Sequence, residues 1–167
     1  MSQMRIYGVT GWKNSGKTGL MERLVYEICG RGLRVSTIKH AHHATDIDQP
    51  GRDSYRHREA GAREVIVASP ARWALMHELR GDPEPPLEDL VARLTPVDLV
   101  LVEGYKRAPH PKIEAHRVET GQPLLAGDNP TVRAVASNGA PEGLSIPVLH
   151  LDDTAAITDF ILREIGL

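Results

Sequence analysis

Apolar residues in this chain gather into short runs that polar and turn-forming residues separate. The runs cover residues 5–10, 33–39, 64–68, 97–103, 113–117, 131–136 and 146–151. Several of them are continuously apolar, whereas a strand with one face in water alternates apolar and polar residues. The pattern therefore predicts about seven strands, several of them covered on both faces of a sheet.

Helical spacing of apolar residues fills several of the intervals between these runs. In the first interval the apolar residues recur three and four positions apart, and two glycines follow: Leu20, Met21, Leu24, Val25 and Ile28, then Gly30 and Gly32. Further helices are expected over residues 54–60, 86–94 and 153–165. Because strands that alternate with helices are typical of parallel sheets, we expect an α/β fold with a mostly parallel central sheet.

The size and charge of the chain favour one compact domain. The chain has 167 residues, of which 41% are hydrophobic, so we expect a single domain over residues 1–167. A formal net charge of −2, with no long run of one sign, argues against nucleic acid or a membrane surface as partner. No apolar run approaches the roughly 20 residues of a membrane span, and we expect a cytoplasmic protein. The single cysteine, Cys29, lies in an apolar stretch and is expected to be a buried thiol.

A phosphate-binding motif stands between the first predicted strand and the first predicted helix. The pattern G-x-x-x-x-G-K-[ST] is matched by Gly11, Trp12, Lys13, Asn14, Ser15, Gly16, Lys17 and Thr18. Glycine tolerates the dihedrals of a loop tight enough to turn its N–H groups inward around phosphates. Lys17 then reaches the β- and γ-phosphates, and the Thr18 hydroxyl can bind Mg²⁺ at the positive end of the helix dipole. We therefore expect a three-layer fold of the P-loop NTPase type that binds a purine nucleoside triphosphate with Mg²⁺.

A candidate magnesium-side carboxylate ends the most apolar strand. Residues 97–103 finish with Glu103, directly before Gly104. P-loop folds place an acid at this point to hold a magnesium-bound water or to orient an attacking one. Lys17 and Glu103 are therefore the candidate catalytic residues, and Thr18 and Glu103 the candidate metal ligands. Asp98, at the other end of the run, is expected to be a solvated or helix-facing acid.

A polar, turn-rich stretch follows the second predicted strand. Its donors and positive charges suit an anionic ligand such as a pterin phosphate, and the candidate set is Lys39, His40, His42, His43, Asp48, Arg52 and Arg56. Two other interpretations stay open. The histidines could bind a transition metal together with Asp46 and Asp48. Alternatively, the stretch could be a polar loop with solvent-exposed histidines.

With these motifs the chain resembles the molybdopterin-guanine dinucleotide biosynthesis adaptor proteins. The resemblance rests on residues 11–18, 38–43 (Ile-Lys-His-Ala-His-His), 46–57 (Asp-Ile-Asp-Gln-Pro-Gly-Arg-Asp-Ser-Tyr-Arg-His), 60–62, 102–106 (Val-Glu-Gly-Tyr-Lys) and 111–114 (Pro-Lys-Ile-Glu). Residues 46–57 are far more specific than the phosphate loop, which many families share. The resemblance implies a GTP-binding homodimer with at most slow hydrolysis. It further implies that the protein supports the molybdenum cofactor guanylyltransferase, which attaches GMP to molybdopterin.

The base preference follows less directly from the residues. Many GTP-binding folds read guanine with an Asn-Lys-x-Asp element, which this sequence lacks. The best-placed substitute is Asn138 after the strand over residues 131–136, where an amide stands in place of the carboxylate. The resemblance implies GTP, while the residues alone leave ATP open.

Two other functions remain compatible with the sequence. One is a P-loop kinase of a small metabolite, with lid charges from Arg52, Arg56, Arg58 and Arg63. The other is a metallochaperone GTPase that uses the histidines at positions 40, 42 and 43.

Overall fold

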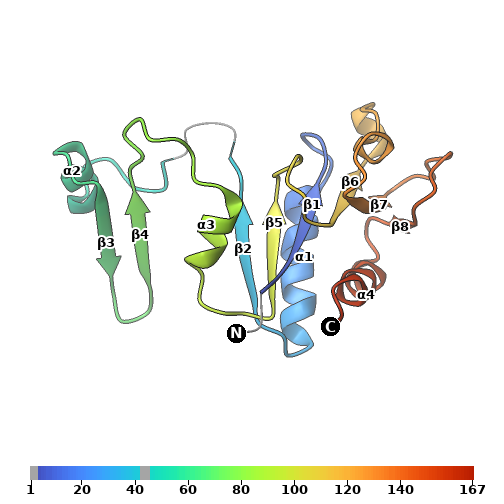
Figure 1. The fold of residues 1–167 in the computed structure, drawn as a ribbon, viewed down its shortest axis with the longest axis horizontal. Helices are drawn as coiled ribbons and strands as arrows, with labels where there is room; N and C mark the ends of the chain where they lie inside the picture. Colours follow the sequence, from blue (N-terminus) through green and yellow to red (C-terminus); the bar gives the residue numbers. More distant parts are fainter. Residues whose placement is uncertain (1–3, 42–45) are drawn as a thin grey trace. The chain divides into compact units, whose positions relative to one another are not determined.

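The computed structural model describes residues 4–41 and 46–167, which fall into two compact units. The first unit comprises Met1–His40 and Arg93–Leu167, and the second comprises Ala41–Ala92. A six-stranded sheet organises the first unit and a two-stranded sheet the second (Figure 1). The expectation of a single domain over residues 1–167 stays a prediction.

A parallel sheet forms the centre of the first unit. Its strands are β1 (Arg5–Thr10), β2 (Val35–Lys39), β5 (Leu99–Glu103), β6 (Lys112–His116), β7 (Val132–Ser137) and β8 (Val148–His150). They lie in the order β2-β5-β1-β6-β7-β8, and every neighbouring pair is parallel. The predicted α/β fold with a mostly parallel sheet is confirmed. Because all the strands run the same way, the loops after β1, β2 and β5 emerge at one edge of the sheet.

Helices α1 (Lys17–Gly30) and α4 (Thr154–Glu164) pack against each other and share one core with the sheet. The core includes Leu20 and Leu24 of α1 and Ile157 and Ile161 of α4, all fully buried. Every second strand residue, such as Tyr7, joins them because successive side chains of a strand point to opposite faces. The predicted helical periodicity is confirmed in both helices. None of the helices within the described residues is long and apolar enough to span a membrane.

The second unit contains an antiparallel hairpin with two short helices. Strands β3 (Glu64–Ala68) and β4 (Trp73–His77) pair with each other, and the helices are α2 (Asp53–Glu59) and α3 (Leu87–Ala92). The expected count of about seven strands in the central sheet is therefore wrong by one, since β3 belongs to a separate sheet. The four residues between β3 and β4 fold the chain straight back, whereas a parallel partner would need a long crossover. The hairpin exposes large apolar side chains, among them Ile66 and Trp73.

Cys29 is exposed, although the sequence predicts a buried thiol. Helix α1 directs Leu20, Met21, Leu24 and Ile28 into the core. A residue one position after Ile28 is rotated by about 100° around the helix axis, which takes Cys29 out of the buried stripe.

Candidate functional site

The loop between β1 and α1 has the backbone of a cradle. Gly11 and Gly16 have φ values of 142° and 92°, and Asn14 between them has a φ of 63°. A Cβ atom added to Gly11 would overlap the carbonyl oxygen of Ala115 and lie 2.5 Å from the Ser15 Oγ. Glycine is therefore required at position 11 by both its dihedral and its close neighbours.

The first turn of α1 offers backbone donors to the loop. Within the described residues no side chain caps this terminus. The first backbone hydrogen bond of the helix runs from the Leu20 N–H to the Gly16 carbonyl at 2.9 Å. The earlier N–H groups of a helix have no intrahelical acceptor, and the helix dipole adds partial positive charge there. This arrangement suits a phosphate group.

A cavity of about 480 Å³ opens at this terminus. It is lined by Lys13, Asn14, Gly16, Lys17, Thr18, Gly19 and Glu103. Its volume lies within the range of roughly 300–1,000 Å³ that is common for small-molecule sites. The structure therefore brings Glu103, the last residue of β5, together with Lys17 and Thr18, the first two residues of α1, although they lie 85 or more positions before it in the sequence.

Positive charge dominates around this cavity. The Lys39 ammonium lies 3.7 Å from the Glu103 carboxylate, and the Lys17 ammonium donates to the Trp12 carbonyl at 2.5 Å. The pKa of Lys17 is lowered, first by burial and then by the like charges of Lys106 and Lys39, while Glu103 opposes the shift. Lys17 and Lys39 thus both interact with Glu103, Lys106 adds a third positive charge near Lys17, and a bound polyphosphate would relieve the repulsion among the three.

The donor set fits Mg²⁺ beside a polyphosphate. Thr18 and Glu103 line the same cavity and offer a hydroxyl and a carboxylate oxygen, which are ligands that this hard cation prefers. Mg²⁺ usually binds through one or two protein oxygens together with waters and substrate phosphates. Two protein ligands are therefore sufficient here.

Trp12 connects the phosphate loop to a later loop. Its indole N–H donates to the Pro123 carbonyl at 2.7 Å, and the Lys106 ammonium lies 4.3 Å from its ring centroid. Sequence reasoning left the role of Trp12 undecided and did not single out Lys106. The position of Lys106 three residues after Glu103 was the available signal, because the loop after β5 emerges at the same edge as the phosphate loop.

A second cavity, of about 440 Å³, shares Lys13 and Asn14 with the first. Its remaining lining comes from the segment after β6, namely Arg117, Glu119, Thr120 and Gln122. The guanidinium of Arg117 lies against the phosphate loop, since a Cβ atom on Gly16 would be 3.0 Å from its Nε. Sequence reasoning missed Arg117 and Glu119, which carry no motif.

Asn138, the expected base-reading amide, already makes hydrogen bonds within the protein. Its Oδ1 accepts from the Val118 N–H at 3.0 Å, and its Nδ2 donates to the two carboxylate oxygens of Glu119 at 2.8 and 2.9 Å. The carboxylate of Glu119 is therefore held in place at the second cavity. A direct contact between Asn138 and a nucleotide stays a prediction.

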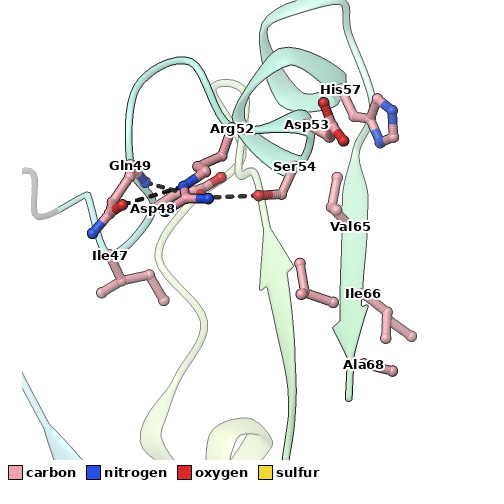
Figure 2. Close-up of a pocket in the computed structure, with 11 residues that line it drawn as sticks. Ile47, Asp48, Gln49, Arg52, Asp53, Ser54, His57, Val65, Ile66 and Ala68 are labelled. Atoms are coloured by element: carbon pink, nitrogen blue, oxygen red, sulfur yellow. Dashed lines mark hydrogen bonds between the residues drawn. The ribbon is translucent and has the colours of Figure 1, made fainter.

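The second unit has a polar cluster around Arg58. The guanidinium of Arg58 contacts Glu78 at 2.6 Å, Asp46 at 2.9 Å and Asp48 at 3.2 Å. Asp48 also accepts from the Ser54 hydroxyl at 3.0 Å (Figure 2). These carboxylates hold the pKa of Arg58 well above its usual range. Arg58 thus ties the segment before α2 to the chain that follows β4.

A cavity of about 620 Å³ in the second unit shares Asp48 with this cluster, and Figure 2 shows the residues that line it. Arg52 lines it and donates to the Gln49 side chain at 3.4 Å, while Asp48 and Asp53 supply negative charge. Valine, isoleucine and alanine side chains of β3 form its other wall. The cavity is larger than the one at the phosphate loop, but its lining has no surplus of positive charge.

The residues of the predicted anion site fall in different units. Lys39 and His40 belong to the first unit, where the His40 N–H donates to the Glu103 carbonyl at 2.9 Å. Asp48, Arg52 and Arg56 belong to the second unit. His42 and His43 lie outside the described residues. Lys39 is thus the member of the set that reaches the carboxylate at the phosphate loop, and the rest of the anion site stays a prediction.

Within residues 4–41 and 46–167, no three His, Cys, Asp or Glu side chains are arranged so that they could hold a metal ion. The histidine interpretation depends on His42 and His43, which are not among those residues, so it stays a prediction.

Family and sequence comparisons agree on one group of proteins. Residues 6–138 match the family described as molybdopterin guanine dinucleotide synthesis protein B. The molybdopterin-guanine dinucleotide biosynthesis adapter protein of Haemophilus influenzae is 44% identical over 163 residues, covering 96% of this chain and 89% of that protein. The adapter protein of Escherichia coli is 41% identical over 155 residues, covering 91% and 88%.

Solved structures agree with the same assignment of fold. The crystal structure of Bacillus subtilis MobB has a TM-score of 0.76 at 27% identity and covers 97% of this chain and 98% of its own. The MobB homologue of Bacillus stearothermophilus has a TM-score of 0.71 at 30% identity, covering 98% and 99%. The P-loop NTPase-like fold expected from the sequence is confirmed.

Proposed function

Because this chain belongs to the molybdopterin guanine dinucleotide synthesis protein B family, we propose that it acts as an adapter in molybdopterin guanine dinucleotide biosynthesis by binding GTP with Mg²⁺ at residues 11–18. The cytoplasm is its proposed location. Any hydrolysis of the bound GTP is slow, as the family resemblance implies.

A single observation carries the nucleotide part of the proposal. The ammonium of Lys17, the hydroxyl of Thr18 and the carboxylate of Glu103 line one cavity at the uncapped first turn of α1. The lining thus combines backbone donors and lysine charge with a carboxylate, and a triphosphate with its cation matches both kinds of group.

The chain supplies a defined contact for each part of this ligand. Lys17 exchanges its bond to the Trp12 carbonyl for the β- and γ-phosphates, and the N–H groups of the first turn of α1 bind phosphate oxygens. Thr18 and Glu103, which line the same cavity, would hold Mg²⁺. When bound, the cation neutralises charge on the terminal phosphates.

The proposed partner is the molybdenum cofactor guanylyltransferase, with molybdopterin as a possible further ligand, and the proposed assembly is a homodimer. The exposed apolar side chains of the β3–β4 hairpin support an interface in the second unit. Ile66 on β3 is 64% exposed and Trp73 on the neighbouring strand β4 is 68% exposed. Such exposure is unusual for large apolar side chains on two paired strands. Light scattering measures the assembly state directly.

The test compares Mg·GTP with Mg·ATP by isothermal titration calorimetry, with and without the guanylyltransferase of the same pathway. We expect GTP to bind more tightly than ATP, chelation of Mg²⁺ to weaken binding, and the transferase to co-migrate with the protein in size-exclusion chromatography. Absence of triphosphate binding would overturn the nucleotide proposal. Absence of a complex with the transferase, under nucleotide saturation, would overturn the proposed partner.

A further inference from the structure

The second cavity of the first unit extends the phosphate site along the loop. It shares Lys13 and Asn14 with the phosphate cavity, and Arg117 lies against Gly16. Its volume of about 440 Å³ is an ordinary size for part of a small-molecule site. A nucleotide whose phosphates occupy the first cavity therefore has an adjoining cavity available for its base and sugar.

A carboxylate stands in the wall of that cavity with its orientation set by another residue. The Asn138 amide donates to both oxygens of Glu119, and the same amide accepts from the Val118 N–H within the 3₁₀ turn that carries Glu119. The pKa of Glu119 is lowered, first by the hydrogen bond from Asn138, so the group is ionised at neutral pH. A carboxylate has about four positions at which it can accept a hydrogen bond. The two hydrogen bonds from Asn138 occupy two of them, so acceptor positions remain for a ligand.

Guanine is the purine whose edge matches such a carboxylate. It presents two adjacent donors, the N1–H and the exocyclic N2 amino group, whereas adenine presents an acceptor at N1 and no donor at C2. A carboxylate can accept hydrogen bonds from both guanine donors. With adenine the same carboxylate would have no donor to pair with and would face the N1 acceptor. Arg117 and Gln122, in the same lining, carry N–H donors suited to the O6 and N7 acceptors of guanine.

We propose that Glu119 is the residue that selects guanine, and that Asn138 is the positioning residue that holds the Glu119 carboxylate for this purpose. The proposal rests on nucleotide binding at residues 11–18 and adds the base-reading group to that site. It also accounts for the absence of an Asn-Lys-x-Asp element, because the carboxylate comes from the turn after β6 and only the amide comes from the end of β7.

Base analogues test the proposal on the unaltered protein. Inosine triphosphate lacks only the N2 amino group of GTP, so we expect its affinity to be about 10- to 100-fold weaker, the value of a hydrogen bond to a charged group. Xanthosine triphosphate carries an oxygen at that position and is expected to bind weakly because that oxygen faces a carboxylate. Equal affinities for GTP and inosine triphosphate would overturn the proposal, whatever the behaviour of any variant.

Substitution of Glu119 provides the second test. Glu119→Gln replaces an acceptor oxygen with a donor amide, so we expect GTP affinity to fall about 10- to 100-fold and xanthosine triphosphate affinity to rise. Asn138→Ala frees the carboxylate and is expected to bring the affinities for GTP and inosine triphosphate closer together. The control is Glu22→Gln, an exposed glutamate on α1 outside both cavities, which should keep the parent ranking of GTP, inosine triphosphate and xanthosine triphosphate.

The outcomes separate this inference from the proposed function. If Lys17→Ala abolishes binding of all triphosphates while Glu119→Gln keeps the parent ranking, the phosphate site stands and the role of Glu119 is overturned. If the parent protein binds no triphosphate, the proposed function fails at the same time. A switch of preference from GTP to xanthosine triphosphate supports both.

Discussion

The phosphate loop and the Arg58 cluster are both rich in charge, but they use it in opposite ways. At the loop, the positive charges of Lys17, Lys39 and Lys106 gather beside an open cavity whose lining contains one carboxylate, that of Glu103. At the cluster, the one guanidinium of Arg58 is surrounded by the carboxylates of Asp46, Asp48 and Glu78.

The difference shows that the balance of partners, not the number of charged residues, distinguishes a binding site from a structural cluster. Where cations outnumber the nearby anions, some of their N–H donors stay available to a ligand. Their mutual repulsion also destabilises the site when no anionic ligand is bound. A cation with several carboxylates has its donors occupied and instead holds segments of the chain together. We therefore expect substitutions in the first region to act on ligand binding and those in the second to act on stability.

The largest expected effect is that of Lys17→Ala. Removal of the ammonium should weaken Mg·GTP binding by about 100-fold or more, because a charge-assisted contact to phosphate is lost in a partly buried site. The melting temperature should change little, since Lys17 contributes one bond to a loop carbonyl. Calorimetry and thermal denaturation measure the two quantities. Arg93→Ala, which removes an exposed positive charge elsewhere in the same unit, is the control. Unchanged GTP affinity in Lys17→Ala would contradict the assignment of the site.

Glu103→Gln should affect turnover more than affinity. Loss of the carboxylate weakens the hold on Mg²⁺, and we expect magnesium-dependent hydrolysis to fall roughly tenfold while nucleotide affinity changes less. Phosphate release under single-turnover conditions measures the rate. Asp98→Asn is the matched control, because Asp98 precedes the opposite end of β5 and pairs with Arg34 at 3.3 Å. Equal rates for Glu103→Gln and the parent protein would count against a magnesium-side role.

Arg58→Met should act on stability and leave nucleotide affinity unchanged. It removes the partner of three carboxylates, which then repel one another. We expect the thermal midpoint to fall by about 2–5 °C. Arg56→Met on the same helix is the control, since Arg56 is exposed and its side chain has no hydrogen bond or ion pair to the residues that the structure describes. A matching loss of stability in both variants would show that the carboxylate contacts are not the cause.

The smallest expected effect is a pH dependence from His110, a half-buried residue whose two ring nitrogens are shielded from solvent. Neither ring nitrogen has a hydrogen-bond partner among the described residues, and burial with the charge of Lys112 lowers the pKa of His110 to about 4. The unfolded chain, with a pKa near 6.5, binds the proton first, so stability is fully present above pH 6.5 and declines as the pH falls toward 4.

Allowing for partial exposure of the ring, the loss between pH 6.5 and 4.5 is on the order of 1 kcal/mol. Urea denaturation at several pH values measures it. His110→Gln should reduce this loss, whereas His57→Gln, at an exposed position, should not. A parent protein whose stability rises between pH 6.5 and 4.5 would contradict the assignment.

Local sequence signals predicted most of the first unit. Short apolar periods and glycine positions predict the phosphate loop, the helices α1 and α4, and the strands β1, β2, β5, β6 and β7. These signals involve only residues a few positions apart in the chain. Glu103 was identified for the same reason, since it ends a continuous apolar strand. Strand β4 (Trp73–His77) was not predicted at all, and the apolar run over residues 64–68 does not reveal which strand it will join.

The sequence by itself determined that a strand, a glycine-rich turn and a helix would form a phosphate cradle, because that unit depends on dihedral preferences and hydrophobic periodicity within residues 5–30. Only the tertiary structure decided which distant side chains complete it. Lys106, Arg117 and Glu119 reach the cradle because parallel pairing places the ends of β5 and β6 on either side of β1. The same long-range packing decided that Arg58 is enclosed by carboxylates. Contacts between residues far apart in the chain arise from the fold as a whole, and no short pattern encodes them.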